Sequence, residues 1–320
     1  MIVNELKRIL KICSISSSIA VINFDNKAAA ISAGQIFIKF CVNTEECDKR
    51  GVMFSCSDIK LSALRGVKSV FFSSSGETWE MYNSETGALL LSGNCPELSS
   101  PVPASGDTPR VVGAVSTSAM KELMAAKAKT SFPVFLYGQR DALVTMYMDP
   151  ICCQLYRVST AGKTTPFSVG FDKKTIEMAV KIMSGLPEGD WSISLFKWWD
   201  LPFASMSANG FEIFVPCVQK KAPAIGNFIK GISAPKINIK LPSDMEGERI
   251  CINTYDGSVN MAKVGSKSND NEHIVSAKAI TAIPFISDGA ELTVSSSGGY
   301  VFINDTGKEN VLRCAVIGQY

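Results

Sequence analysis

Few residues in this sequence have the type and spacing that catalysis or metal binding requires. The segment 159–167, STAGKTTPF, contains the Gly-Lys-Thr that ends a phosphate-binding loop, but Arg157 stands where that loop needs a glycine. Cys152 and Cys153 are adjacent, so in a strand their side chains point to opposite faces and do not share a tetrahedral metal ion. His273 is the only histidine, which argues against a multi-histidine metal site or a Cys–His catalytic pair. We therefore expect no enzymatic activity, no cofactor and no metal.

Basic residues, in contrast, gather on one face of a predicted helix. Asp172 is placed to cap this helix and Gly185 to end it, and apolar residues recur with helical spacing between them. Lys173, Lys174 and Lys181 fall on the opposite face. Taken alone, such a face is ordinary solvation. Its meaning depends on the elements around it.

The composition restricts the class of protein. The chain has 320 residues, 46% of them apolar, and no apolar run reaches the 18 residues typical of a membrane span. Charged residues interrupt the segment 1–14, so we expect no signal peptide there. Most of the ten cysteines lie among aliphatic residues, which favours free thiols in a reducing cytoplasm. The net charge of +2 does not by itself indicate a nucleic-acid partner.

A repeat of nearly constant length runs through the whole chain. Each unit begins with a short helix pattern and continues with three strand-like runs of alternating polarity. The predicted helices begin near residues 3, 58, 116, 172, 224 and 276, so the units are 52 to 58 residues long. In the fourth unit, for example, the helix precedes strands at 190–195, 201–208 and 211–218.

Two changes of composition group the six units into pairs. The segment 94–110 is rich in Pro, Ser and Gly, and 216–226 marks the second change. We therefore predict three domains, at 1–95, 111–218 and 224–320, each with two helices and roughly eight antiparallel strands. An apolar helix face packed on such sheets gives a two-layer α+β architecture.

Six units of helix plus strands in three tandem domains resemble the DNA polymerase sliding clamps of the bacterial β type. The resemblance covers the whole chain and lies in architecture and unit length, because this family has no short invariant signature. It implies that two chains close head-to-tail into a ring around duplex DNA, with helices lining the hole and sheets outside. It also implies a DNA polymerase and a clamp loader as partners, no membrane contact, and a location in the cytoplasm of a bacterial or phage-infected cell.

The basic helix residues acquire a role in such a ring. Contacts to phosphates are independent of base sequence and spread over equivalent sites, so they allow a ring to slide. Lysine suits these contacts because it is a flexible point charge. All six predicted helices carry basic residues away from the apolar stripe. The candidate DNA-binding residues are Lys7, Arg8, Lys11, Lys60, Lys68, Lys121, Lys129, Lys173, Lys174, Lys181, Lys230 and Lys278.

In the clamp family, partner proteins insert a short apolar peptide into a groove on the outer face, between the second and third domains. The residues that the resemblance places at this groove are Pro216, Leu241, Pro242, Val316 and Ile317. The tail 315–320, AVIGQY, departs from the Met- and Pro-rich ending common in bacterial members. This departure suggests other partners, such as those of a phage or plasmid replisome. A plain final strand of the sheet is an equally open interpretation of the tail.

Two alternatives to a ring stay open at this stage. An open, monomeric processivity factor of the same fold would hold DNA on one basic face. A phage structural or host-interaction protein with repeated β-rich domains would carry the same lysines for solvation alone. The mass in solution separates the first alternative from a ring, and the effect of lysine replacement on polymerase processivity separates the second.

Overall fold

The computed structural model describes all residues except 2, 15–17, 24–26, 43–50, 98–109, 125–131, 149–151, 161, 235, 242–246, 264, 287–290 and 306–310. The chain forms two compact units, each made of two segments. The first unit comprises Met1–Val111 with Lys174–Cys217, and the second comprises Val112–Lys173 with Val218–Tyr320. Each unit thus holds one expected terminal domain and half of the expected middle domain. The division into three domains stays a prediction.

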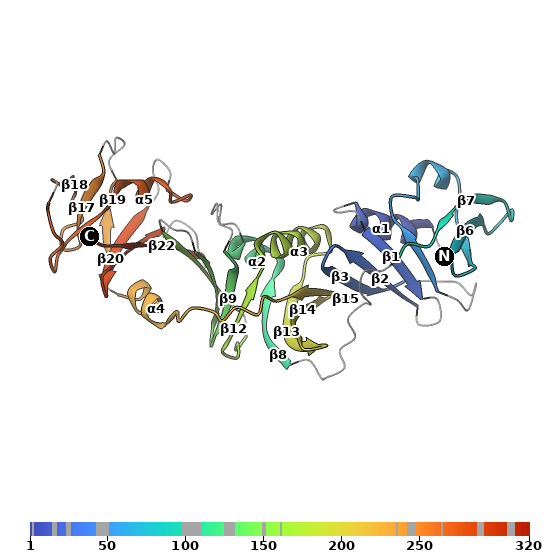
Figure 1. The fold of residues 1–320 in the computed structure, drawn as a ribbon, viewed down its shortest axis with the longest axis horizontal. Coiled ribbons are helices and arrows are strands. Elements are labelled where there is room, and N and C mark those ends of the chain that lie inside the picture. Colours follow the sequence, from blue (N-terminus) through green and yellow to red (C-terminus); the bar gives the residue numbers. More distant parts are fainter. Residues whose placement is uncertain are drawn as a thin grey trace. The chain divides into compact units, whose positions relative to one another are not determined.

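The first unit combines two α-helices with antiparallel strands (Figure 1). Its elements are α1 (Val3–Cys13), β1 (Ser18–Asn23), β2 (Ala28–Ala33), β3 (Ile36–Cys41), β4 (Val52–Ser55), the 3-10 helix η1 (Leu61–Leu64), β5 (Val70–Ser74), β6 (Thr78–Asn83), β7 (Leu89–Asn94), α3 (Lys173–Gly185), β13 (Asp190–Trp198), β14 (Leu201–Ala208) and β15 (Phe211–Pro216). The strand β8 (Arg110–Ser116) and the start of α3 cross the boundary between the units.

Seven strands of the first unit follow one another in a single antiparallel sheet, in the order β4-β1-β2-β3-β15-β14-β13. Their register aligns a row of fully buried side chains across all seven: Phe54, Ala20, Ile31, Ile38, Ile213, Met206 and Ile193. We call the face that carries this row the helix face of the first sheet, because α1 and α3 cover it (Figure 1). The opposite face carries an aromatic cluster of Phe37, Phe196, Phe203 and Phe214.

The second unit has the same kind of construction. Its elements are α2 (Thr117–Leu123), β9 (Val134–Gln139), β10 (Ala142–Met148), β11 (Cys153–Ser159), β12 (Phe167–Phe171), α4 (Gly226–Ile232), β16 (Ile237–Ile239), β17 (Arg249–Asn253), β18 (Val259–Met261), β19 (Glu272–Ser276), α5 (Ala277–Thr281), β20 (Leu292–Ser297), β21 (Tyr300–Asp305) and β22 (Val311–Gly318). Eight of these strands form one sheet in the order β12-β9-β10-β11-β22-β21-β20-β16.

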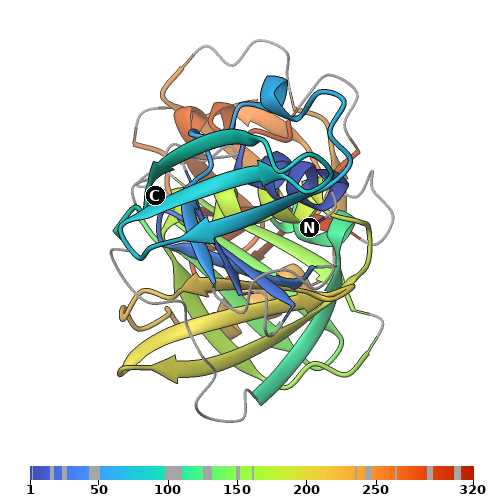
Figure 2. The same ribbon diagram turned by 90° about the vertical axis from the view of Figure 1, so that its right-hand side faces the viewer.

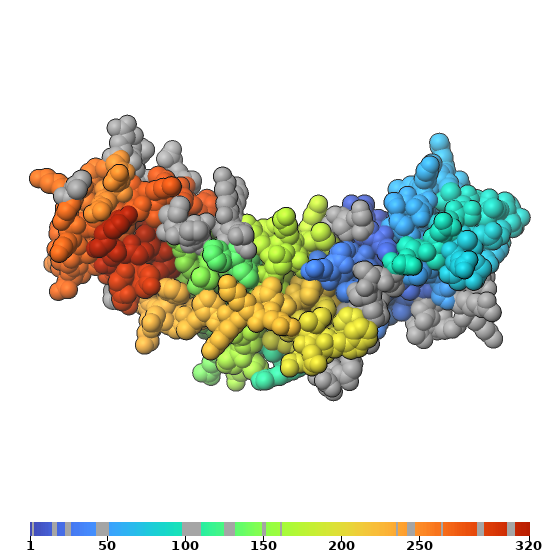
Figure 3. Space-filling model, viewed as in Figure 1, coloured from blue at the N-terminus to red at the C-terminus, as the bar shows by residue number. Residues whose placement is uncertain are grey.

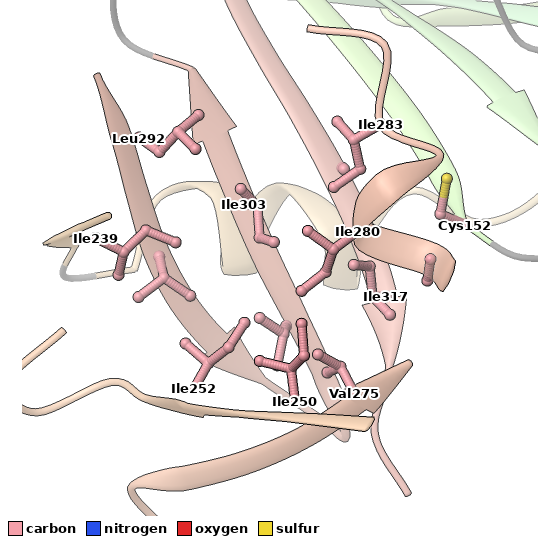
Figure 4. Close-up of a cluster of buried hydrophobic side chains, with 14 of the residues drawn as sticks. Cys152, Ile239, Ile250, Ile252, Val275, Ile280, Ile283, Leu292, Ile303 and Ile317 are labelled. Atoms are coloured by element: carbon pink, nitrogen blue, oxygen red, sulfur yellow. The ribbon is translucent and has the colours of Figure 1, made fainter. Parts of the chain in front are cut away.

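The two faces of this second sheet are covered differently. One face is covered by α5, whose Ile280 packs in one buried cluster with Ile303 and Ile317 of the sheet (Figure 4). The other face carries a second buried cluster, which contains Phe302 and Val316 together with Ile232 of α4. Because successive residues of a strand point to opposite faces, α5 and α4 lie on opposite sides of the sheet, as Figure 1 shows.

Two small sheets complete the units, β5-β6-β7 in the first and β18-β17-β19 in the second. Figure 2 shows the first of them (cyan to teal) as a separate layer of three strands. In each small sheet a chain terminus covers one edge. Met1 exchanges backbone hydrogen bonds with Val70 of β5, and the N–H of Tyr320 donates to the carbonyl of Ile274 in β19. The edges formed by β7 and β18 are left without a paired strand among the described residues.

Most predicted elements are confirmed, but the helix predicted from residue 58 to residue 68 is wrong. Helices occupy 3–13 and 173–185 as expected. Within this predicted range only the four residues of the 3-10 helix η1 are helical. Lys60 and Arg65, on either side of η1, have an extended backbone with ψ of 123°. Leu64 is the one buried residue of η1, whereas Leu61 is 58% exposed. A short helix is stable mainly through a buried apolar stripe, and this segment has none.

Candidate nucleic-acid interface

Four exposed lysines of the first unit lie on the two helices that cover its large sheet. In α1, Lys7 and Lys11 are exposed on the side away from the buried stripe. In α3, Lys174 and Lys181 are exposed in the same way, opposite a buried stripe that includes Ile176. None of these four ammonium groups makes an ion pair within the part of the chain that the structure describes. They are available to a polyanion.

Two other predicted cations of these helices are engaged in the fold. The guanidinium carbon of Arg8 lies 5.0 Å from the ring centroid of Phe40 and 5.2 Å from that of Phe211. Its Nη2 also donates to the carbonyl of Cys41 at 3.1 Å, and Nη1 lies 3.5 Å from the Glu5 carboxylate. Arg8 therefore joins α1 to the junction of β3 and β15. Lys173 is only half-exposed and has interactions of its own.

The structure does not place Lys60 and Lys68 on a helical face. Lys60 precedes η1 and Lys68 follows it, so neither shares a helix with other basic residues. The Nζ of Lys68 lies 3.6 Å from the Glu85 carboxylate, and both side chains are more than half exposed. Exposed pairs of this kind contribute little to stability.

In the second unit, Lys121 and Lys278 are exposed on helices that cover the same face of the large sheet. The carbonyl of Leu123 at the end of α2 accepts hydrogen bonds from Thr145 and Tyr147 of β10, at 2.6 and 3.2 Å. Through the register, Tyr147 lies in the same row as Ile303, which packs against α5. Both helices therefore lie on one face, and their lysines extend from it.

Lys230 is exposed on α4 and is not brought to that face. The Ser295 hydroxyl donates to the carbonyl of Gly231 at 2.9 Å, and Ser295 pairs with Phe302, whose side chain lies on the opposite face of the sheet. The structure therefore does not bring Lys230 to the face of Lys121 and Lys278, and a contact of Lys230 with DNA stays a prediction. Periodicity locates a helix but does not specify which face of a sheet it covers. Lys129 lies outside the described residues.

The predicted groove residues fall into separate places. Val316 is buried in the cluster beneath α4, whereas Ile317 belongs to the cluster beneath α5, and the partly buried Leu241 packs against that second cluster. Pro216 ends β15 of the first unit, and Pro242 lies outside the described residues. The structure therefore brings Leu241 and Ile317 to one cluster but not Val316.

A half-buried apolar surface that sequence reasoning missed surrounds Val316. It comprises Met148, Cys153, Ala222, Ile225, Phe228 and Leu312. Three of these residues belong to the segment 218–232, which crosses the strands β9 to β11 on the surface (Figure 3, light orange over green). The Tyr137 hydroxyl donates to the carbonyl of Pro223 at 2.9 Å and fixes this segment. The apolar residues between 222 and 228 were a signal for such packing.

Comparison with solved structures bears on the fold. The chain is similar to a putative DNA polymerase III β subunit from Eubacterium rectale, with 12% identity and a TM-score of 0.66. The match covers 100% of this chain and 98% of that protein. The chain has the fold of the bacterial β sliding clamps. The β subunit from Thermotoga maritima has 14% identity, a TM-score of 0.61 and coverage of 100% of this chain and 98% of its own. The sliding clamp from Bacillus subtilis has 11% identity, the same TM-score, and coverages of 99% and 97%.

No protein-family model matches the sequence, and no curated protein sequence matches it either. The likeness to the sliding clamps is therefore one of fold. In the described part of the chain, no three His, Cys, Asp or Glu side chains are placed to hold a metal ion together. No helix there is long and apolar enough to span a membrane.

Three cysteines within this sliding-clamp fold, Cys153, Cys217 and Cys314, behave as small apolar side chains. Burial raises the pKa of the Cys153 and Cys217 thiols to about 12, and it raises the pKa of Cys314 as well. These thiols are therefore protonated at neutral pH, whereas a nucleophile or metal ligand needs the thiolate. The site for DNA must therefore be sought among the exposed ammonium groups and not among these three thiols.

Proposed function

We propose that the chain is a DNA sliding clamp, a non-enzymatic processivity factor that encircles duplex DNA and tethers a replicative polymerase. The observation that carries the proposal is the combination of a sliding-clamp fold over the full chain with unpaired lysines on its helices. Lys7, Lys11, Lys174 and Lys181 are free to meet phosphates. Flexible ammonium groups that contact only the backbone hold DNA without fixing a register, so the protein slides.

Closure into a ring of two chains is supported by the edges of the two small sheets. The termini cover β5 and β19, which leaves β7 and β18 as the edges without a partner in the described structure. Leu89 of β7 is 54% exposed and Met261 of β18 is 48% exposed. An open edge with apolar residues is a template for pairing with another chain. We infer that β7 of one chain pairs with β18 of the other, head-to-tail, at both junctions.

The half-buried apolar surface around Val316 is the site we propose for partner peptides. Polymerase and loader peptides that carry apolar side chains would pack on Phe228, Leu312 and their neighbours, on the face of the second sheet opposite α2 and α5. Contact on that face leaves Lys121 and Lys278 free for DNA. A clamp must hold DNA and polymerase at the same time, and this arrangement separates the two surfaces.

Charge reversal on the helices tests the role in DNA binding. We expect Lys7→Glu/Lys11→Glu and Lys174→Glu/Lys181→Glu each to weaken binding to a short labelled duplex, measured by fluorescence anisotropy at several salt concentrations. The slope of log affinity against log salt should fall by about 1 for each lysine that contacts phosphate. The matched control is Lys27→Glu/Lys39→Glu, because Lys27 lies in a turn and Lys39 points away from the helix face.

Three results decide whether the helix lysines bind DNA. The control should bind within about twofold of the wild type, since phosphate contacts lie elsewhere. Circular dichroism must show that all variants are folded. If the helix variants bind DNA as the wild type does, or if the control loses as much affinity as they do, the proposed interface is wrong.

A further inference from the structure

Cys13 and Cys56 form a pair of free thiols that no part of the proposed function uses. Their Sγ atoms lie 2.6 Å apart, although 43 positions separate them in the sequence. Cys13 is the last residue of α1 and is buried, whereas Cys56 follows β4 and is partly exposed. A disulfide has a bond length of about 2.05 Å, so a shift of roughly half an ångström joins the two sulfurs.

The backbone around the pair is already fixed. The N–H of Cys56 donates to the carbonyl of Ser18 at 3.0 Å, and the Ser18 hydroxyl donates to the carbonyl of Cys13 at 3.4 Å. Ser18 thus connects the end of α1 to the turn after β4. The two cysteines keep their positions through these contacts, and not only through the sulfur atoms.

We propose that Cys13 and Cys56 are a reversible modification site that forms an intramolecular disulfide with low-molecular-weight disulfides such as oxidised glutathione. The partly exposed Cys56 reacts first. Its thiolate attacks one sulfur of the glutathione disulfide, which gives a mixed disulfide and releases one glutathione thiolate that takes up a proton. The Cys13 sulfur then attacks the Cys56 sulfur, loses its proton to solvent and displaces the second glutathione. Two cysteine thiols are oxidised by two electrons, and one glutathione disulfide is reduced to two glutathiones.

The disulfide would tie the C-terminal end of α1 to the first sheet. In the reduced protein, α1 is held by its buried stripe and by Arg8. A covalent link between positions 13 and 56 restricts the unfolded chain and stabilises the folded unit. Because α1 carries Lys7 and Lys11, oxidation fixes one of the helices that present exposed lysines.

Peptide mapping of the full-length protein tests this directly. The chain is incubated with oxidised glutathione, remaining thiols are alkylated, and trypsin is added without reductant. Trypsin releases Cys13 in the peptide 12–27 and Cys56 in the peptide 51–60, each with no other cysteine. We expect one cross-linked species, two hydrogen masses below the sum of these peptides, that disappears after treatment with dithiothreitol. The thermal midpoint should rise on oxidation and return on reduction.

The matched variants are Cys56→Ser and Cys41→Ser, since Cys41 is a lone exposed cysteine. Oxidation should raise the midpoint of Cys41→Ser as it does for the wild type and leave Cys56→Ser unchanged. Recovery of both peptides as alkylated thiols, or of the 51–60 peptide carrying glutathione without the cross-link, would overturn the proposal. A cross-link from Cys13 to any other cysteine would overturn it as well.

Discussion

At the scale of single residues, Arg313 connects parts of the second unit that are far apart in the sequence. Its Nη2 lies 3.3 Å from the Glu122 carboxylate on α2, and its Nη1 lies 3.4 Å from the Asp305 carboxylate on β21. The Arg313 side chain is only 18% exposed. Replacement by Met would remove this cation from both carboxylates, of which Asp305 is 10% and Glu122 31% exposed. We expect Arg313→Met to lower the free energy of unfolding in urea by about 3 kcal/mol.

The control for Arg313 is Arg157→Met on the same sheet. Arg157 also forms an ion pair, with Asp141 at 3.6 Å, but these side chains are 39% and 76% exposed. Solvent screens such a pair, so its loss should cost less than about 1 kcal/mol. If both substitutions lower the free energy of unfolding by the same amount, burial of the Arg313 ion pairs does not contribute to stability.

The turn between β13 and β14 contains two residues with unfavourable backbone conformations. Trp199 and Asp200 have φ of 47° and 63°, the left-handed region that favours Asn and Gly. We expect Asp200→Gly to raise the free energy of unfolding by about 0.5–1 kcal/mol, because glycine has no Cβ to strain at this φ. Asn209 and Gly210 form the next turn along the chain with similar angles. Gly210→Asp should therefore destabilise, and a loss of stability in Asp200→Gly would contradict the argument.

Single residues also show where sequence reasoning stops. The polar residues 266–272 that precede His273 are typical of a loop, but His273 lies in β19, is 4% exposed and has Nε2 3.0 Å from the Thr254 hydroxyl. Its burial results from pairing with Ile252 of β17, a contact that the local sequence does not encode. The exposed Lys7, Lys174 and Lys181 were predicted correctly because the helix pattern alone fixes their side.

At the scale of elements, α4 shows the limit of periodicity most clearly. Its residue range was predicted closely, but its place on the second sheet was not. The face that a helix covers depends on which strands pair beneath it. Here β22 pairs with β11, which is more than 150 residues upstream, and the resulting face receives α4 through Phe302 and Val316. Strand pairing over such distances left no pattern in the local sequence.

The close approach of α4 to this face depends on Gly231. A Cβ atom at this position would collide with the ring of Phe302, which is 1% exposed. We expect Gly231→Ala to lower the thermal midpoint and to cost about 1–3 kcal/mol, because the ring has no space to move into.

Gly226→Ala, at the first residue of the same helix, is the matched control for Gly231→Ala. An added Cβ there has no neighbour within 4 Å, so alanine should be neutral or slightly stabilising. If the two substitutions have the same effect, α4 does not pack on Phe302 as the structure has it.

At the scale of the whole molecule, the regular length of the units carried the resemblance to the sliding clamps, and the solved structures confirm that fold. No motif carried that prediction, and no family model matches the sequence. Six similar units are informative together because each must bury an apolar helix face or a sheet face against a neighbour. What spacing does not supply is the way two chains meet, since that depends on which strand edges the folded chain leaves open.

Those open edges make the ring testable. We expect the wild type to have twice the 34.5 kDa mass of one chain in sedimentation at micromolar concentration. Leu89→Lys on β7 or Met261→Lys on β18 should give monomers, because a charged residue on an edge strand blocks pairing. Leu61→Lys is the control, since Leu61 is similarly exposed, at 58%, but lies in η1 and not at a sheet edge.

Combination of the edge variants distinguishes direct pairing from general destabilisation. If β7 and β18 meet across the junction, Leu89→Lys together with Met261→Glu places opposite charges at each junction and should restore part of the dimer. Leu89→Lys together with Met261→Lys places like charges there and should not restore it. A wild-type monomer that still binds duplex DNA through Lys174 and Lys181 would contradict the ring and support the open processivity factor. A wild-type dimer unaffected by either edge substitution would show that the chains meet through another surface.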